Sequence, residues 1–445
     1  MRILPFSQIS RFQVFMLGSH ILLTKTISDF LSVDVKLLIC KPEDILKIYN
    51  IDITKNIHKS HYKIDTISSL LIAKVTKEET IYFIGIHLKG KALKTIRYNK
   101  ILNHIAGAVS KALDECSEKN FRNAPSLLNE NLIQRMVASY LALRANYNRF
   151  ILSFLIDKMK SLMATTFEGK QFSSGLIVTK SFPMYAKGMM YEGRLLQISK
   201  RHNLFDPIDN RFWYLVDGID NFYITGMKDF AINYMYLTLD KRGEMQKMTP
   251  HKFLKGGDYI FRVYNGRELS IITKDDIEFI YQENVWRFRD YKGLKGIITE
   301  DLGMGESIYE AFISYILYCS KNEISSIIWI PLNDTSDELN KMFSTSNSIP
   351  EDSPINICNE SYEGLLMRML SSDGACVFNK NGDLLRYGCI IKAENPNNAA
   401  APPEQKVKGT GESAAAQLAS NGIAFKISQD GTIKFFHAKN EVIKF

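Results

Sequence analysis

The feature that most constrains the fold is the regular alternation of helical and strand patterns from about Gly303 to the end of the chain. Ser307 and Glu310 have the spacing of a capping box, so a helix is expected to begin at Ser307. Apolar residues then recur at helical spacing, and short apolar runs follow that have the length of buried strands. An Asn-Gly pair at 381–382 separates two such runs and predicts a hairpin.

These patterns predict an α/β domain over 297–445, built on a mixed β-sheet that is flanked by helices. Helices are expected over 308–317, 365–370 and 413–420. Strands are expected over 327–330, 374–378, 384–391, 423–427 and 433–436.

The sequence upstream of this domain divides into three further parts. Residues 1–122 mix short apolar runs with a helical pattern and predict a small α/β domain. Apolar residues recur at helical spacing between 126 and 163, so 123–166 is expected to be a helical connector. Residues 167–296 alternate aromatic and β-branched residues with polar ones, which predicts a β-rich sensor domain. Its clearest strands are expected over 211–216, 234–239 and 259–264.

Charge is divided unevenly along the chain. The net formal charge is +8, but residues 301–445 carry 12 Lys and Arg against 18 Asp and Glu, which leaves −6 there and +14 on the first 300 residues. The positive charge of the first 300 residues is typical of a surface that binds a nucleic acid or an acidic partner, but also of an ordinary solvated surface, and these alternatives stay open. An acidic domain that binds a polyphosphate usually needs a divalent cation.

The six cysteines are scattered, without a Cys-x-x-Cys pair or the Cys and His spacing of a zinc site. No stretch of about 18 uncharged apolar residues occurs, and the apolar segment near the start lacks a cleavage site. Neither a membrane span nor a signal peptide is expected. The composition therefore predicts reduced thiols and a soluble, cytoplasmic protein.

Two glycine-marked loops in the last third are the candidate functional sites. Asp373-Gly374-Ala375 lies between a helix end and a strand, where a carboxylate can orient a hydroxyl, hold a metal or merely shape a turn. The run Gly-Thr-Gly-Glu-Ser at 409–413 precedes an alanine-rich helix, so its N–H groups and the helix N-terminus converge on one point. That arrangement suits a phosphate, although glycine-rich turns before helices are also common structural caps.

Taken together, the two loops resemble the diadenylate cyclase domain family, which occurs in a DNA-integrity-scanning protein and in membrane-bound and sensor-fused bacterial relatives. The resemblance covers about residues 300–445. It is carried by the Asp-Gly-Ala motif within 372–378, by Gly388 on the paired strand, and by the segments 409–415 and 426–433. Members of this family join two ATP molecules into cyclic di-AMP with a divalent metal, and two domains meet face to face with one ATP each.

The resemblance implies a role for each matching residue. Asp373 would lie near the reacting 3′-hydroxyl and its metal, which is Mg²⁺ or Mn²⁺. Gly374 and Ala375 would lie near the nucleoside, and Gly409 and Thr410 at the phosphates. The predicted nucleotide-binding set is completed by Gly388, Lys408, Gly411 and Ser413.

One departure from the family pattern concerns the phosphate loop, where Gly411, Glu412 and Ser413 stand in place of the usual Arg-His group. A carboxylate beside a triphosphate is repulsive by about 1 kcal/mol at 4 Å even in water. One interpretation makes Glu412 a catalytic residue and a second metal ligand, paired with Asp373. The other makes it a helix residue that the dipole favours, in a domain that has lost catalysis.

The expected function is therefore a nucleotidyl cyclase that makes cyclic di-AMP from ATP. The first 300 residues would sense an unknown signal ligand and control how two cyclase domains face each other in a homo-oligomer. The alternative is a catalytically inactive, nucleotide-binding regulatory module. A DNA-binding regulator that acts through residues 1–165 is a third hypothesis, and it rests on the charge division alone.

Overall fold

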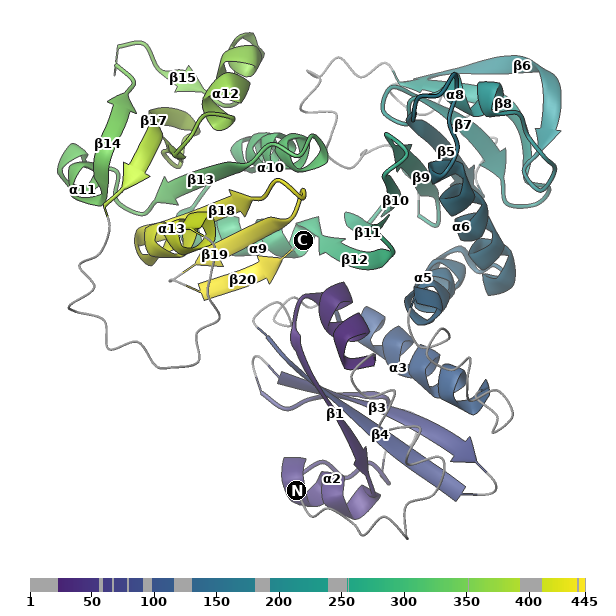
Figure 1. Ribbon diagram of the computed structural model, residues 1–445. Coiled ribbons are helices and arrows are strands. Elements are labelled where there is room, and N and C mark those ends of the chain that lie inside the picture. Colours follow the sequence, from purple (N-terminus) through teal and green to yellow (C-terminus); the bar gives the residue numbers. More distant parts are fainter. Residues whose placement is uncertain are drawn as a thin grey trace. The chain divides into compact units, whose positions relative to one another are not determined.

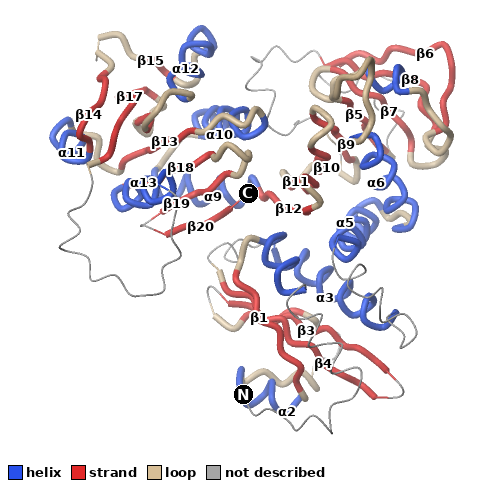
Figure 2. The backbone as a smooth tube through the Cα atoms, viewed as in Figure 1, coloured by secondary structure: helices blue, strands red, loops and turns tan. Residues whose placement is uncertain are grey.

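The computed structural model describes residues 23–55, 59–65, 68–77, 80–90, 98–115, 130–180, 193–238, 254, 256–350, 352–392, 410–437 and 440–444. The chain divides into two compact units, one formed by 1–239 with 252–290 and the other by 240–251 with 291–445. The described residues form three β-sheets accompanied by helices (Figure 1), and Figure 2 shows strands and helices in both units. The predicted mixed α/β class is confirmed.

The first sheet has four antiparallel strands in the order β1-β4-β3-β2. A buried cluster that includes Ile45, Tyr62 and Leu70 joins the helix α2 to this sheet. This arrangement matches the α/β architecture predicted for the start of the chain. Its elements are β1 (Asp34–Cys40), α2 (Pro42–Tyr49), β2 (His61–Lys63), β3 (Ser68–Lys77), β4 (Thr80–Lys89) and α3 (Tyr98–Glu115).

The predicted helical connector is a pair of helices, α5 (Glu130–Ala145) and α6 (Arg149–Met163). Asn146 follows α5 with φ at 47°, a left-handed conformation that ends the helix. The Asn148 side chain then accepts a hydrogen bond from the N–H of Phe150 and caps α6. The break between the two helices is therefore encoded by two asparagines.

The second sheet has eight strands in the order β12-β11-β10-β9-β5-β7-β8-β6, and it belongs to the same unit. The pair β5 and β7 is parallel, whereas the neighbouring pair β5 and β9 is antiparallel. The predicted β-rich character is confirmed, with strands at two of the three expected places. The strands are β5 (Ser174–Thr179), β6 (Gly193–Asn203), β7 (Asn221–Gly226), β8 (Ala231–Thr238), β9 (Tyr259–Tyr264), β10 (Glu268–Thr273), β11 (Ile277–Gln282) and β12 (Val285–Asp290).

The strand predicted over 211–216 is wrong, because this segment forms the short helix α8 (Asn210–Tyr214). The Asp209 side chain caps the helix by accepting a hydrogen bond of 2.9 Å from the N–H two residues later. Phe212 is buried in the helix, and its ring stacks on Tyr223 with centroids 4.0 Å apart. Capping and this aromatic contact outweigh the strand propensity of the sequence.

A buried charged cluster spans strands β9 to β12 of the second sheet. Glu278 lies 3.6 Å from Arg262 and 3.5 Å from Arg289, and all three side chains are at most 3% exposed. Ser270 Oγ also donates a hydrogen bond to the Glu278 carboxylate. The Glu278 carboxylate therefore supplies one negative charge that two buried guanidinium groups share.

The third sheet belongs to the second unit and follows the order β14-β17-β16-β13-β18-β19-β20, with β15 paired to β17 beside this path. Strands β13 and β16 are parallel, and β13 and β18 are antiparallel. The strands are β13 (Ser326–Pro331), β14 (Phe343–Ser348), β15 (Ile355–Asn356), β16 (Ala375–Phe378), β17 (Asp383–Ile391), β18 (Gly422–Ile427), β19 (Ile433–His437) and β20 (Asn440–Lys444). The helices are α9 (Tyr291–Leu302), α10 (Glu306–Lys321), α11 (Ser336–Met342), α12 (Glu363–Leu370) and α13 (Thr410–Leu418).

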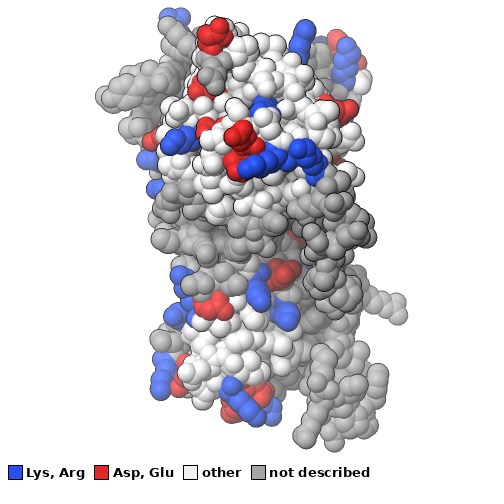
Figure 3. All heavy atoms as spheres, turned by 90° about the vertical axis from the view of Figure 1, so that its left-hand side faces the viewer, with Lys and Arg blue, Asp and Glu red and all other residues white. Residues whose placement is uncertain are grey.

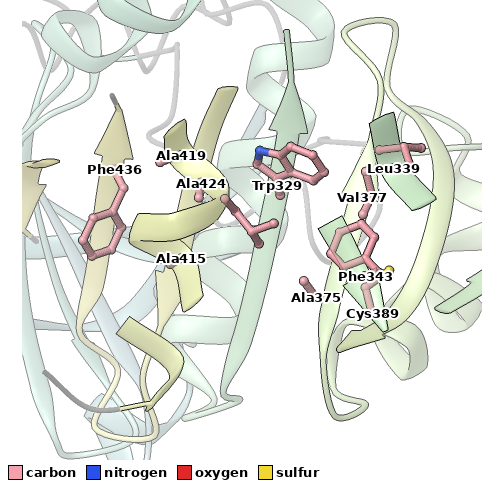
Figure 4. Packing of buried hydrophobic residues seen from close by; sticks show 11 residues of the cluster. Trp329, Leu339, Phe343, Ala375, Val377, Cys389, Ala415, Ala419, Ala424 and Phe436 are labelled. Atoms are coloured by element: carbon pink, nitrogen blue, oxygen red, sulfur yellow. The ribbon is translucent and has the colours of Figure 1, made fainter. Parts of the chain in front are cut away.

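One face of this sheet packs against the alanine-rich helix α13. Ala415 of α13, Ala424 of β18 and Trp329 of β13 belong to one buried cluster (Figure 4). Trp329 and Ala424 are direct partners in the register of β13 and β18, so the helix lies across both strands. The small alanines let the helix approach the sheet, and this contact fixes where the first turn of α13 lies.

The elements predicted for this unit are confirmed with two differences. Helix α10 begins at Glu306 with Gly305 as its N-cap, so Ser307 lies inside the helix and the predicted capping box is wrong. Helix α13 begins at Thr410, three residues before the expected start at 413, because the glycine at 411 is tolerated in the first turn. Thr410 and Gly411 therefore belong to the helix itself.

Candidate functional site

The loop that precedes β16 and the first turn of α13 lie at the same end of the third sheet. The register pairs Ala375 of β16 with Ile327 of β13. Ile327 pairs with Lys426 of β18, which pairs with Lys434 of β19. A Cβ atom added to Gly411, in the first turn of α13, would lie 2.9 Å from Lys426 Cε. Adjacent strands are about 4.8 Å apart, so roughly 10 Å separate the backbones of Ala375 and Lys426.

Two glycines hold the Asp373 loop against the neighbouring strand. Gly374 has φ at +98°, and a Cβ atom there would lie 2.7 Å from the backbone N of Cys389. Gly388 on the opposite strand has φ at +59°. Both angles are in the left-handed region, which favours glycine. The Asp373 side chain is exposed, and no described residue pairs with its carboxylate.

Replacement of Gly374 by alanine is expected to destabilise the second unit by about 2–3 kcal/mol, because the methyl group meets backbone atoms in a left-handed conformation. The free energy of opening of β16 and β17, measured by hydrogen exchange, tests this. Gly364→Ala in α12 is the matched control, since nothing lies within 4 Å of its Cβ position. The control should be neutral or stabilise the unit by up to about 1 kcal/mol. Equal effects of the two changes would contradict the prediction.

The first turn of α13 contains a close ion pair. Glu412 is the third residue of the helix, and its Oε2 accepts a hydrogen bond of 2.5 Å from Lys434 Nζ on β19. Their side chains are 21% and 19% exposed, so solvent screens the pair only in part. A carboxylate in the first turn also interacts favourably with the helix dipole.

A second lysine lies beside this pair. Lys426 Nζ donates a hydrogen bond of 2.7 Å to Ser325 Oγ, in the residue just before β13. Burial lowers the pKa of Lys426. Gly411 gives this side chain its room, because a side chain at 411 would displace it. Two cations, Lys426 and Lys434, therefore lie under the first turn of α13. Lys434 pairs with a carboxylate, whereas the described hydrogen bond of Lys426 goes to a serine hydroxyl.

The depressed pKa of Lys426 predicts a pH dependence of stability. Between the folded pKa and the unfolded value of about 10.4, the unfolded chain binds more protons, so the free energy of unfolding rises with pH across this window. Lys426→Met removes this contribution. The difference in unfolding free energy between wild type and variant should therefore shift in favour of wild type from pH 7 to pH 9.5. Lys341→Met, at an exposed ion pair, is the control, and its difference in unfolding free energy from wild type should not change with pH. If the difference for Lys426→Met does not change with pH either, the prediction is disproved.

The structure places the predicted site residues in three groups. Asp373, Gly374, Ala375 and Gly388 lie together at the start of β16 and on β17. Thr410, Gly411, Glu412 and Ser413 form the first turn of α13. Lys408 and Gly409 lie outside the described residues.

Asp373 and Glu412 are not brought into contact. Glu412 pairs with Lys434 on β19, which lies three strands from β16, or about 14 Å between backbones. Within the described part of the chain, no group of three or more His, Cys, Asp or Glu side chains is arranged to hold a metal ion. The exposed Asp373 carboxylate could supply one oxygen ligand to a hard cation such as Mg²⁺ or Mn²⁺. The Glu412 carboxylate is already engaged by a cation.

Sequence reasoning missed Lys426 and Lys434 as site residues. The strand pattern contained a sign of this role. Lys426 is two residues from the buried Ala424, and Lys434 is two residues from the buried Phe436, so each lysine lies on the buried face of its strand. A lysine at an inward position of an amphipathic strand is unusual. What the sequence did not contain was the position of α13 above these two strands.

This end of the sheet combines three chemical features. Asp373 offers an exposed carboxylate at one side, and the first turn of α13 offers N–H groups of the kind that bind phosphate. Lys426 and Lys434 add positive charge under that turn. The arrangement can therefore place a phosphate near the helix and a hydroxyl or metal near the carboxylate.

The surface charge on one face of the molecule is mixed. Figure 3 shows Lys and Arg side chains interspersed with Asp and Glu over the described residues of that face. None of the described helices has the length and hydrophobicity that a membrane span requires.

Comparison with known proteins gives little to classify the chain. No family model matches it, and no curated protein sequence matches it. Among solved structures, the chain is similar to the crystal structure of a hypothetical membrane spanning protein from Bacillus cereus, with 17% sequence identity. That similarity covers 35% of this chain and 74% of the other, with a TM-score of 0.24. The case for function therefore depends on the site itself.

Proposed function

We propose that the second unit is a nucleotidyl cyclase that condenses two ATP molecules into cyclic di-AMP, under control of the residues that precede it. The observation that carries the proposal is the position of the Asp373 loop and the first turn of α13 at one end of the same sheet. Two loops 35 residues apart in the sequence are joined there by the register of β16, β13 and β18. The resemblance of both loops to the diadenylate cyclase family supports the same function.

In this proposal, the 3′-hydroxyl oxygen of one ATP attacks the α-phosphorus of the other. A phosphodiester bond forms, the bond from the α-phosphorus to pyrophosphate breaks, and the hydroxyl proton passes to the Asp373 carboxylate. A second, reciprocal step closes the ring, so two ATP molecules give one cyclic di-AMP and two pyrophosphates. Bound Mg²⁺ or Mn²⁺ would neutralise phosphate charge at Asp373.

Lys426 and Lys434 would offset the repulsion between the Glu412 carboxylate and a bound triphosphate. A bare carboxylate would repel the triphosphate, but Lys434 lies 2.5 Å from it and compensates its charge. Lys426, whose described hydrogen bond goes to a serine, then contributes a second positive charge directly under Gly411. These two cations would take the place of the Arg-His group of the family pattern. Nucleotide binding should accordingly raise the low pKa of Lys426.

The reaction requires a second copy of the chain. Each copy of the second unit has one Asp373 loop and one α13, so it would hold one ATP, and cyclisation would bring the second units of two chains face to face. The residues before the second unit would then control activity by changing how often the second units of two chains meet. Control by a signal ligand is part of the proposal, because it uses the remaining two thirds of the chain.

Incubation of the full chain with ATP and Mg²⁺ or Mn²⁺ tests the proposal. Mass spectrometry should detect cyclic di-AMP, and a coupled assay should detect two pyrophosphates for each cyclic product. GTP in place of ATP tests nucleotide selectivity. If ATP binds but neither product forms at any protein concentration or with either metal, the chain is not a cyclase.

A second candidate is a module that binds a nucleotide without turning it over. The observation in its favour is that Glu412 has the position and partner of an ordinary first-turn residue of a helix. Calorimetry separates the two functions. A non-catalytic module would bind ATP equally well with and without a divalent cation, whereas the cyclase should bind ATP more tightly with the cation and release pyrophosphate.

A further inference from the structure

A cavity of about 350 Å³ lies among the three helices α3, α5 and α6 of the first unit. A second cavity of about 360 Å³ adjoins it between α3 and the first sheet, since Asn103 and Gly107 line both. Volumes of this size are typical of sites for small molecules. Both cavities lie in the first unit and contain none of the residues of the proposed cyclase site.

Each of the three helices contributes one cation to the wall of the first cavity. These are Lys111 of α3, Arg135 of α5 and Arg149 of α6. Among the described residues that line the cavity, none is acidic. Because the described lining contains three basic and no acidic side chains, an anion placed in this space would be favoured over a neutral molecule. The planar guanidinium group suits carboxylate and phosphate because it donates two parallel hydrogen bonds.

The rest of the wall is neutral and partly apolar. His104 packs edge-on against Tyr140 with ring centroids 5.6 Å apart, and burial lowers its pKa, so the neutral ring is favoured. Ala108 and Ala138 supply small apolar surfaces. A Cβ atom added to Gly107 would meet nothing within 4 Å, so this glycine leaves the cavity open. A ligand with an apolar body and an anionic group matches this lining.

We propose that the cavity among α3, α5 and α6 binds a small organic anion through Lys111, Arg135 and Arg149. The anionic group is a carboxylate or a phosphate, which share the geometry that guanidinium groups recognise. The two adjoining cavities leave room for the body of the ligand along α3. Such a ligand has the chemistry of a metabolite, and this site does not depend on whether the second unit turns nucleotide over.

Calorimetry on the full chain tests the proposal with AMP as the phosphate probe, citrate as the carboxylate probe and adenosine as the neutral control. At least one of the two anions should bind, and adenosine should not. Arg135→Met combined with Arg149→Met should weaken that binding by about tenfold or more. Lys341→Met, at an exposed position in the other unit, should leave the affinity unchanged.

A second variant blocks the cavity without removing charge. Gly107→Leu would fill the open space on α3, and leucine is a better helix former than glycine, so the fold should be retained. Gly296→Leu in α9 is the matched control, because a Cβ atom there also meets nothing within 4 Å. Gly107→Leu should reduce the affinity about tenfold or more, and the control should not. If neither anion binds, or if both cavity variants bind like wild type, the proposal is wrong.

Discussion

Asp373→Asn should lower cyclic di-AMP formation by about a thousandfold or more while leaving the second unit folded, if the proposed cyclase function is correct. A positioned carboxylate that accepts a proton contributes roughly 10²- to 10⁴-fold to rate, and this one would also hold the metal. The side chain is exposed and pairs with no described residue, so its loss removes no packing or hydrogen bond. Product formation is measured by mass spectrometry and folding by hydrogen exchange.

Asp334→Asn is the matched control for this experiment. Asp334 is another exposed loop carboxylate beside the same sheet, but it follows β13, whereas Asp373 precedes the parallel strand β16. The two carboxylates therefore lie at opposite ends of the sheet. The control should retain full activity. Equal activity of the Asp373 and Asp334 variants would exclude Asp373 from the chemistry, whatever the rest of the site does.

The second large effect is expected in the first unit, where Glu278→Gln should reduce stability by about 3–5 kcal/mol. Glutamine keeps the shape of the side chain but removes the negative charge that the buried guanidinium groups of Arg262 and Arg289 share. Protein interiors do not solvate such charges, so the sheet must open or admit water. Protection of β9 to β12 from hydrogen exchange is the measurement, because it reports on this sheet alone.

The matched control is Asp229→Asn, which breaks an exposed ion pair with Arg201 in the same unit. Exposed pairs contribute little, so its effect should stay below about 0.5 kcal/mol. A combined variant with Arg262→Met, Glu278→Leu and Arg289→Met should regain most of the lost stability, since the three charges of this cluster are then removed together. If Glu278→Gln is as mild as the control, the three side chains are not coupled as their distances indicate.

The positions of the strands in the second unit were the part of the fold that could be predicted best, because they follow from the period of the hydrophobic residues. Strands β13, β16, β17 and β18 were expected within one or two residues of where they lie, because each has a buried face and a turn at its end. The segment 211–216 shows the limit of this reasoning. Its aromatic residues suit a strand, but the capping contact of Asp209 and the stacking on Tyr223 exist only in the folded unit.

The glycines of the candidate site could be predicted from the sequence, whereas the partners of its charged side chains could not. Gly374 and Gly388 were identified because a motif contains them, and the structure supplies the reason, which is a positive φ at both. The partner of Glu412 could not be predicted, since Lys434 is 22 residues away and meets it only when α13 lies over β19. An ion pair between a helix and a strand depends on tertiary packing, and single-sequence patterns do not contain it.

The row of paired residues from Ala375 through Ile327 to Lys426 has a mechanical consequence. Ladder hydrogen bonds set the distance between Ala375, beside the Asp373 loop, and Lys426, which lies under the first turn of α13. A sheet resists stretching across its strands far more than a loop resists bending. The two halves of the site therefore cannot close on a ligand by moving toward each other within one unit. Under the proposed cyclase function, any tightening would come from the ligand or from a second copy of the chain that contacts this edge, so the site would be complete only in the assembled pair.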